Sequence, residues 1–312
     1  MIKIIADTRI IAKSNERKVV SKKLLLLSIL FLSFNVFPQT TSFSKKPLSK
    51  SLNKNYESQI TVYLTEAKWN ELFPNRYGKG ELNQVKNGKD FYSFKSFLKA
   101  AQYFPGFISG NEVSQKRELA AFLANIAQET SGGWDEAPGG YFKWGLYFLK
   151  ETSITKNDYA DYSKKNYPPV KGKSYYGRGP KQLSWNYNYG QFSEAWFGTK
   201  DSLLRHPEWL EQNAVLSFAS AIWFWMTPQF PKPSCHEIMT GKWKPTDADL
   251  QKGRKPGFGA TVNVINGGVE CGIGKDLDKT VYRYRYYLYF CKYFQVSPGE
   301  NIECTNQTPF GQ

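Results

Sequence analysis

The sequence predicts a mainly α-helical domain that runs from about residue 60 to the end of the 312-residue chain. Three observations favour this class. Apolar residues recur at helical spacing in several segments, strand-like alternation is brief, and no internal repeat is visible. With 41% hydrophobic and 22% charged residues, the composition is that of a folded domain, which excludes disordered, collagen-like and multi-span membrane proteins.

Residues 1–38 have the pattern of a secretory signal peptide with a long basic n-region. Residues 1–50 contain ten Lys or Arg against two acids and carry +8 of the net charge of +15. The apolar run at 24–37 has 14 residues, which is short for a bilayer span, and no A-x-A cleavage site follows it. A retained anchor is the alternative, whereas a buried helix fits poorly because the run has no polar face. We expect cleavage, a polar linker at 39–60, and a secreted mature protein without a stable membrane span.

Helical patterning then appears in five segments. The clearest is 116–130, in which Leu119, Phe122, Leu123 and Ile126 lie at i, i+3, i+4 and i+7, and Gly132-Gly133 follow as a stop signal. The apolar segment at 211–226 predicts a central buried helix. The five predicted helices cover residues 64–74, 92–104, 116–130, 211–226 and 279–294.

Glu129 is the candidate general acid. It follows Phe122 and Ile126 by seven and three residues and so shares their face, where partial burial would raise the pKa of a carboxyl group as acid catalysis requires. The alternative is an exposed residue on a fraying last turn. Trp134, just after the glycines, is either a platform for a sugar ring or a core residue.

Glu151 is the candidate partner carboxylate. It lies 22 residues after Glu129, beyond an aromatic, glycine-rich segment that can hold two acids across a cleft. Glycoside hydrolysis needs one protonated carboxyl group to donate to the leaving oxygen and one ionised carboxylate to activate water or attack the sugar. Spacing alone does not single out this pair, because Asp135, Glu136 and Asp158 are also close in sequence.

Two further segments carry neutral hydrogen-bonding groups between glycines and aromatic residues. Residues 174–190 predict an irregular loop with amides and hydroxyls that suit sugar hydroxyl and acetamido groups better than phosphates, although such a loop can also simply bond to itself. Residues 256–272 place amides in an apolar run, where they are either buried and satisfied or face a ligand. The candidates are Gln182, Ser184, Asn186 and Asn188 in the first segment, and Asn263, Asn266 and Glu270 in the second.

Metal, cofactor and histidine-assisted chemistry are not expected. His206 and His236 lie 30 residues apart, and the cysteines include no C-x2-C pair. All cysteines fall in the last 78 residues, and export would allow at most two bridges among them, with three possible connectivities. Buried free thiols are the alternative for Cys235, Cys271, Cys291 and Cys304.

Four stretches, in this order, resemble the catalytic domain of the glycoside hydrolase family 19 chitinases: FLANIAQETSGGW, SYYGRGPKQLSWNYNYG, AIWFWMTPQFPKPSCH and TVNVINGGVECG. The likeness covers residues 61–312. It implies a two-lobed, lysozyme-like fold with a substrate cleft between the lobes. The implied activity is that of an endochitinase that hydrolyses β-1,4 linkages between N-acetylglucosamine units with inversion.

The resemblance also implies residue roles. Glu129 would be the general acid, Glu151 the general base, and Ser184 would hold the attacking water. Glu270 and Arg283 would form a charged network behind the acid, with Arg285 as the alternative arginine. Beside the candidate Trp134, the residues expected to bind substrate are Gln182, Tyr187, Asn188, Lys232 and Asn266.

This chain departs from the family pattern in three ways. Gln128 stands where members usually carry a histidine, and an amide can donate a hydrogen bond but cannot titrate. No cysteine precedes Cys235, so the bridges that many plant members have in the first half of the domain are absent; the resemblance pairs Cys271 with Cys304 and leaves Cys235 and Cys291 undecided. The loop at 155–173 has diverged.

The partner expected from the resemblance is chitin or its oligosaccharides, bound by a monomer without cofactor or metal. One alternative is a lysozyme-like enzyme that hydrolyses peptidoglycan, because such domains share the cleft and the recognition of N-acetylglucosamine. Another is an inactive chitin-binding protein, which the presence of both acids disfavours. Nucleic acid is not expected as a partner, since much of the basic charge belongs to the leader and no recognition motif is present.

Overall fold

The structure, a computed structural model, describes residues 47–50, 52–53, 57–78, 85–86, 89–152, 158–275 and 277–312. The predicted signal peptide and the first part of the predicted linker lie outside these residues. Across the ranges that are described, no helix has the length and apolar character needed to cross a membrane.

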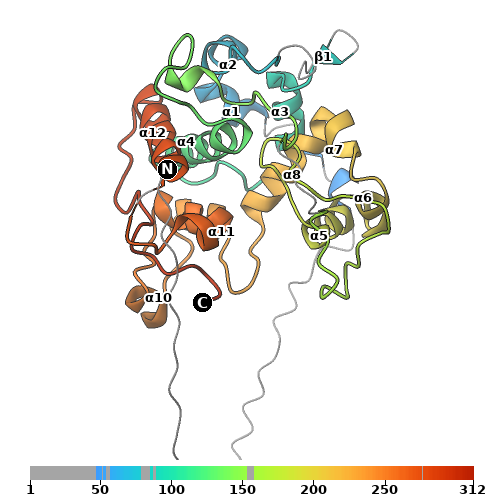
Figure 1. The fold of residues 1–312 in the computed structure, drawn as a ribbon. Helices are drawn as coiled ribbons and strands as arrows, with labels where there is room; N and C mark the ends of the chain where they lie inside the picture. The colour runs from blue at the N-terminus through green and yellow to red at the C-terminus, as the bar shows by residue number, and fades with distance from the viewer. Residues whose placement is uncertain are drawn as a thin grey trace, which may run out of the picture. The chain divides into compact units, whose positions relative to one another are not determined.

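Helices dominate the described part of the chain, which confirms the mainly α prediction (Figure 1). Two short strands, β1 (Val85–Lys86) and β2 (Lys89–Asp90), pair antiparallel with Val85 opposite Asp90. Two 3-10 turns are η1 (Leu48–Lys50) and η4 (Tyr141–Lys143). The α-helices are α1 (Glu57–Tyr63), α2 (Glu66–Leu72), α3 (Phe94–Ala101), α4 (Glu112–Thr130), α5 (Asn186–Phe197), α6 (Asp201–Arg205), α7 (Trp209–Gln212), α8 (Ala214–Met226), α9 (Cys235–Met239), α10 (Asp247–Gln251), α11 (Phe258–Glu270) and α12 (Asp278–Tyr293).

The core is centred on α4. Helix α12 packs along α4, and α3 packs along α8. The predicted apolar face of α4 is buried, and the ring of Phe122 stacks on that of Phe97, which in turn stacks on Trp69 from α2. Burying each large apolar side chain contributes about 1.5–3 kcal/mol to folding. This packing fixes the direction of α4, and with it the position of Glu129 at its carboxyl end.

Capping side chains explain where four helices begin. In each case a side-chain oxygen just before the helix accepts a hydrogen bond from a backbone N–H of the first turn, which satisfies a donor that the helix itself leaves unpaired. Asn111 thus starts α4 four residues before the predicted 116, and Asn213 divides the predicted helix 211–226 into α7 and α8. These four caps are Thr65, Ser93, Asn111 and Asn213, and Ser234 and Thr246 cap α9 and α10 in the same way.

Helix extends into the predicted loop 174–190 and into the apolar run 256–272, for which no element was predicted. The last five residues of 174–190 form the start of α5, so Tyr187 and Asn188 lie on a helix rather than on the predicted loop. Most of 256–272 forms α11, with a break from helical geometry at Asn266. Glycine and β-branched residues disfavour helix locally, but burial of Phe258 and its neighbours overrides that preference.

The folded domain includes residues before the expected start at 61. Helix α1 begins at Glu57, and Ile60 within it is fully buried. Further back, η1 packs against α5, and the backbone N–H of Asn53 donates to the Gln102 carbonyl at 2.7 Å. Part of the predicted linker 39–60 is therefore in contact with the domain.

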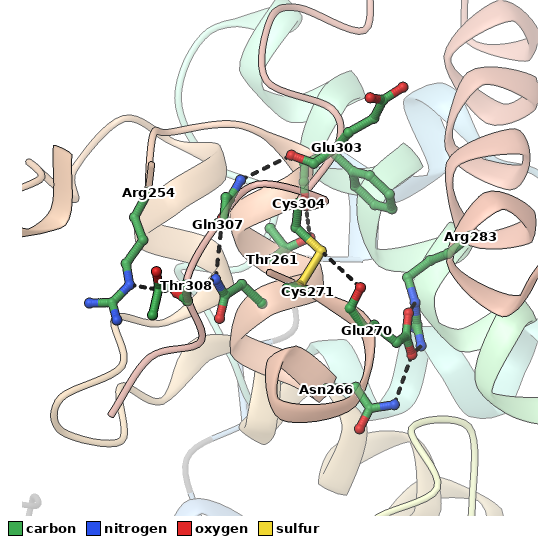
Figure 2. The surroundings of a disulfide bond; sticks show 12 residues. Arg254, Thr261, Asn266, Glu270, Cys271, Arg283, Glu303, Cys304, Gln307 and Thr308 are labelled. Atoms are coloured by element: carbon green, nitrogen blue, oxygen red, sulfur yellow. Dashed lines mark hydrogen bonds and ion pairs between the residues drawn. A yellow bond between two sulfur atoms is a disulfide. The ribbon is translucent and has the colours of Figure 1, made fainter. Parts of the chain in front are cut away.

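The carboxy-terminal segment covers α11 (Figure 2). The N–H of Gly259 donates to the Asn301 carbonyl at 2.9 Å, and a Cβ at Gly259 would lie only 2.1 Å from the Glu303 carbonyl oxygen, so this close approach requires glycine. A disulfide joins Cys271 to Cys304, the pair that the resemblance implies. Two free cysteines, Cys235 and Cys291, are buried.

Candidate active site

A cavity of about 200 Å³ lies at the carboxyl end of α4. Both predicted carboxylates, Glu129 and Glu151, line it. Residues on either side of them and one residue from the segment before α5 complete the wall: Gln128, Ser131, Phe148, Lys150, Thr152 and Gln182. The fold therefore brings together two acids that the sequence separates by a long irregular segment.

Thr130 ties that irregular segment to the end of α4. Its Oγ1 donates back to the Ile126 carbonyl at 2.6 Å and accepts from the N–H of Leu146 at 2.7 Å. Its own carbonyl accepts from the N–H of Phe148 at 2.8 Å. Because Thr130 is fully buried, these bonds hold the strand of chain that leads to Glu151 directly against the helix that carries Glu129.

Glu129 is held from behind by Arg283 of α12. One Arg283 Nη2 donates to Glu129 Oε1 and to Glu270 Oε1, each at 2.8 Å, and Nε donates to Glu270 Oε2 at 3.2 Å. The Glu129 side chain is only 14% exposed, so it is not the exposed end residue that spacing alone allowed. Arg283, rather than Arg285, occupies the network; Arg285 pairs at the surface with Asp135.

Glu270 is the buried anion of this network and is 1% exposed. Burial alone would raise its pKa, but the charge and hydrogen bonds of Arg283 outweigh burial and hold the pKa below its usual range. Asn266 also donates to Glu270 Oε1, at 2.8 Å (Figure 2). Asn266, expected to bind substrate, is thus bonded to the network behind the acid.

Two members of this network were not anticipated from the sequence. Asn125, one turn before Glu129 on α4, accepts a hydrogen bond from Arg283 Nη1 at 2.9 Å. Lys181, which is 8% exposed, places Nζ 3.6 Å from Glu129 Oε2 and 4.7 Å from the centre of the Phe224 ring. The only sequence signal was position: Asn125 sits at i−4 from Glu129, and Lys181 adjoins the candidate Gln182.

Glu151 has neutral partners instead. The hydroxyl of Tyr159 donates to Oε1 at 2.8 Å, and the N–H of Gly177 donates to Oε2 at 3.4 Å. Burial, together with the neighbouring Glu151 carboxylate, raises the pKa of Tyr159 to about 12, so the phenol keeps the proton that it donates. Tyr159 lies in the diverged loop and was not a sequence candidate.

Gly177 brings the polar segment before α5 up to Glu151. A Cβ on Gly177 would lie 2.9 Å from Gln182 Oε1 and 3.3 Å from Ser184 Oγ, so both side chains crowd the backbone that contacts the carboxylate. Ser184 Oγ donates to the Gln182 carbonyl at 2.9 Å, and Asn188 Nδ2 donates to the Ser184 carbonyl at 2.9 Å. The segment bonds to itself, and the Gly177 backbone that Ser184 approaches also donates to Glu151.

The remaining predicted binding residues lie apart from the small cavity. Tyr187 and Lys232 line a second cavity of about 670 Å³. Burial, reinforced by the nearby charge of Lys181, lowers the pKa of Lys232, whose Nζ donates to the Val264 carbonyl at 3.0 Å. Trp134 is 39% exposed, with its ring centre 5.1 Å from that of Trp144, so it is not a core residue.

Within the described ranges, no group of three His, Cys, Asp or Glu side chains could hold a metal ion. The two histidines contact carboxylates outside the candidate site. His236 Nδ1 lies 2.7 Å from Oε1 of the fully buried Glu118, and His206 Nδ1 lies 3.1 Å from Glu208 Oε1.

Comparisons with known proteins relate the chain to one family and one fold. The family described as "Chitinase class I" matches residues 68–304. A papaya (Carica papaya) protein named "Endochitinase" is 48% identical over 230 residues, covering 73% of this chain and 92% of that protein. The "Inactive chitinase-like protein 1" of Hevea brasiliensis is 49% identical over 224 residues, covering 72% and 69% respectively. The crystal structure of a family GH19, class IV chitinase from Zea mays superposes with a TM-score of 0.58 at 33% identity and covers 79% of this chain and 100% of that one.

Proposed function

This chain belongs to the glycoside hydrolase family 19 chitinases, and we propose that it is an active endochitinase that cleaves β-1,4 linkages between N-acetylglucosamine units with inversion. One observation carries the proposal: Glu129 and Glu151, which are 22 residues apart in the sequence, line a single cavity and have partners of different charge. Glu129 pairs with the cations Lys181 and Arg283, whereas Glu151 accepts a hydrogen bond from the neutral hydroxyl of Tyr159.

Glu129 acts as the general acid in this proposal. It donates a proton to the oxygen of the departing sugar, and the negative charge it acquires is met by Arg283 and Lys181. Because Arg283 also pairs with Glu270, a proton on Glu129 Oε2 leaves the buried Arg283–Glu270 pair intact.

Glu151 acts as the general base. The hydrogen bonds from Tyr159 and the Gly177 N–H orient its carboxylate, which takes a proton from water as the water attacks the anomeric carbon. Ser184, whose Oγ lies near the Gly177 backbone, supplies a hydroxyl to orient the water. An inverting enzyme needs room for that water, with carboxyl groups about 6.5–9.5 Å apart, whereas a retaining enzyme has them about 5–5.5 Å apart.

Sequence identity alone does not decide activity, because the inactive Hevea relative is as similar to this chain as the papaya endochitinase is. The argument for activity is the presence of both acids in one cavity. We further propose secretion with removal of residues 1–38, since the basic, apolar leader is typical of export and the Cys271–Cys304 bridge persists in oxidising compartments.

The test is parallel incubation of the purified protein with N-acetylglucosamine oligosaccharides and with peptidoglycan. We expect cleavage of the chitin oligosaccharides, and proton NMR of the fresh products should show the α-anomer before mutarotation. Release from peptidoglycan alone would replace the proposal with the lysozyme-like alternative, and an initial β-anomer would remove Glu151 from the role of base. No release from either would indicate an inactive binding protein.

A further inference from the structure

The disulfide between Cys271 and Cys304 lies beside the charge network that supports Glu129 (Figure 2). Cys271 directly follows Glu270, which is the last residue of α11. Cys304 Sγ lies 3.8 Å from the carbonyl oxygen of Glu270. The bridge therefore holds the backbone of the residue whose carboxylate pairs with Arg283.

Cys304 also contacts the residue next to Arg283. The backbone N–H of Cys304 donates to the hydroxyl of Tyr284 at 2.7 Å, and that hydroxyl lies 3.6 Å from Cys304 Sγ. Tyr284 follows Arg283 on α12 and is 5% exposed. Cys304 is thus connected to both members of the buried pair, covalently through the neighbour of Glu270 and by a hydrogen bond to the neighbour of Arg283.

The last turn of α11 needs this support because the helix is interrupted before it. Asn266 departs from helical geometry, with φ −146° and ψ 29°, and two glycines follow it. Gly268 and Val269 in this turn are exposed, as are residues 272–275 beyond the bridge. Glycine has more backbone freedom than any other residue, so a turn that starts at a break and contains two glycines is fixed by its tertiary contacts.

A shift of Glu270 would change the surroundings of the proposed catalytic acid. Arg283 Nη2 donates to both Glu270 and Glu129 at 2.8 Å, so Glu270 neutralises part of the charge that Arg283 presents to Glu129. If Glu270 moved away, that charge would act on Glu129 alone and oppose the protonation that a general acid needs. Substrate binding would be spared, since neither Tyr284 nor the bridge lines the catalytic cavity.

We propose that the Cys271–Cys304 bridge and the hydroxyl of Tyr284 together position the buried Arg283–Glu270 pair behind the catalytic acid, and that this positioning sets the turnover number rather than the affinity for substrate. Tyr284 and the two cysteines are positioning residues, because they act through the pair and not on the sugar. The inference rests on the proposed function for the reaction that the pair supports.

The test compares kcat, KM and the pH–rate profile of the wild type, Tyr284→Phe and Tyr287→Phe on the N-acetylglucosamine tetramer. Tyr284→Phe removes only a hydroxyl and should lower kcat about tenfold, leave KM within about twofold and move the alkaline limb of the profile to lower pH. Tyr287→Phe is the matched control, because Tyr287 is fully buried on the same helix and donates to the Pro298 carbonyl at 2.8 Å. Its kcat, KM and profile should equal those of the wild type.

A second variant removes the bridge itself. At a temperature where circular dichroism shows a folded protein, Cys271→Ala/Cys304→Ala should reproduce the loss of kcat and the shift of the alkaline limb. Cys291→Ala is its control, because it removes a buried free thiol from α12 and leaves the bridge in place. Cys291→Ala should keep the wild-type kcat and profile even where it lowers the melting temperature.

Amide hydrogen exchange, followed by mass spectrometry, separates this inference from the proposed function. Peptides that cover residues 267–275 should exchange faster in Tyr284→Phe than in Tyr287→Phe. That difference, in a protein whose wild type hydrolyses nothing, would refute the proposed function and leave the support of the pair standing. Hydrolysis by the wild type with the same kcat and profile in both tyrosine variants would overturn the inference, as would a change confined to KM or equal exchange in the two variants.

Discussion

Replacing Arg283 by Met should destabilise the domain and make its stability depend on pH in a new way. Arg283 is 2% exposed and donates hydrogen bonds to Glu129, Glu270 and Asn125. Methionine fills similar volume but leaves Glu270, itself 1% exposed, as a buried anion without its cation. Removing one partner of such a pair costs about 3–5 kcal/mol, a large share of the roughly 5–15 kcal/mol that stabilises a typical domain.

The sign of the pH dependence follows from Glu270. In the wild type, Arg283 outweighs burial and lowers the pKa of Glu270 below its usual 4.5, so this group adds stability above that pH and loses it as the pH falls through the folded pKa. Without Arg283, only the hydrogen bond from Asn266 and the charge of Lys279 oppose burial, so the pKa of Glu270 should rise. The penalty is then largest at neutral pH and shrinks toward pH 4.5, by about 1.4 kcal/mol for each unit by which that pKa is raised.

The assay is urea unfolding followed by circular dichroism at pH 7 and pH 5, with Arg285→Met as the control. Arg285 lies on the same helix, pairs with Asp135 at the surface and lies 5.2 Å from the centre of the Tyr141 ring, so its loss should change stability by less than about 1 kcal/mol at either pH. A loss below about 1 kcal/mol for Arg283→Met, or the same loss at both pH values, would show that the pair does not behave as a buried ionic network.

Three further predictions concern the catalytic groups and the bridge. Glu129→Gln should abolish nearly all hydrolysis of a chitin tetramer without lowering the melting temperature, because an isosteric amide cannot donate the proton. Glu151→Gln should cause a less complete loss of hydrolysis, because water still attacks unassisted. Near wild-type rates in both variants would contradict the assignment. Tyr159→Phe should lower kcat about tenfold with little change in KM, since Glu151 loses the hydroxyl that donates to it at 2.8 Å. The alkaline limb of the pH–rate profile below pH 10 should be unaffected, because the pKa of the phenol is about 12. An unchanged kcat would mean that Tyr159 does not position the base. Cys304→Ala removes a disulfide that spans 33 residues and should lower the free energy of unfolding by about 3–4 kcal/mol, or the melting temperature measured by calorimetry by about 10 °C. Non-reduced peptide mapping of the wild type that finds Cys271 free or linked elsewhere would refute the pairing.

The fold was predictable where a local pattern and burial agree. The apolar face of α4 follows a strict helical period, and its four predicted residues are buried. Helix α11 contradicts its local signals, because Gly259 and Gly267 sit in a helix that is buried against α9, α12 and the covering carboxy-terminal segment. In α5, the polar and aromatic composition hides a helix whose inner face is set by contact with α6 and α8.

The candidate site was predictable as a set of residue types but not as an arrangement. Arg283 and Glu129 are 154 residues apart, and only the packing of α12 along α4 makes one the partner of the other. Lys181 and Tyr159 carry no motif of their own. Only the fold shows that the ammonium group of Lys181 lies near Glu129 and that the hydroxyl of Tyr159 donates to Glu151.

The carboxy-terminal segment that covers α11 makes the order of synthesis matter. Asn263 of α11 donates to the Thr308 carbonyl and accepts from the Phe310 N–H, so α11 is completed by residues that leave the ribosome after α12. A premature stop before Cys304 would still encode every residue of the candidate active site. The truncated product would nevertheless lack the segment that covers α11, the helix that carries Asn266 and Glu270. It would therefore fail because it does not complete its folding, although no candidate active-site residue is missing.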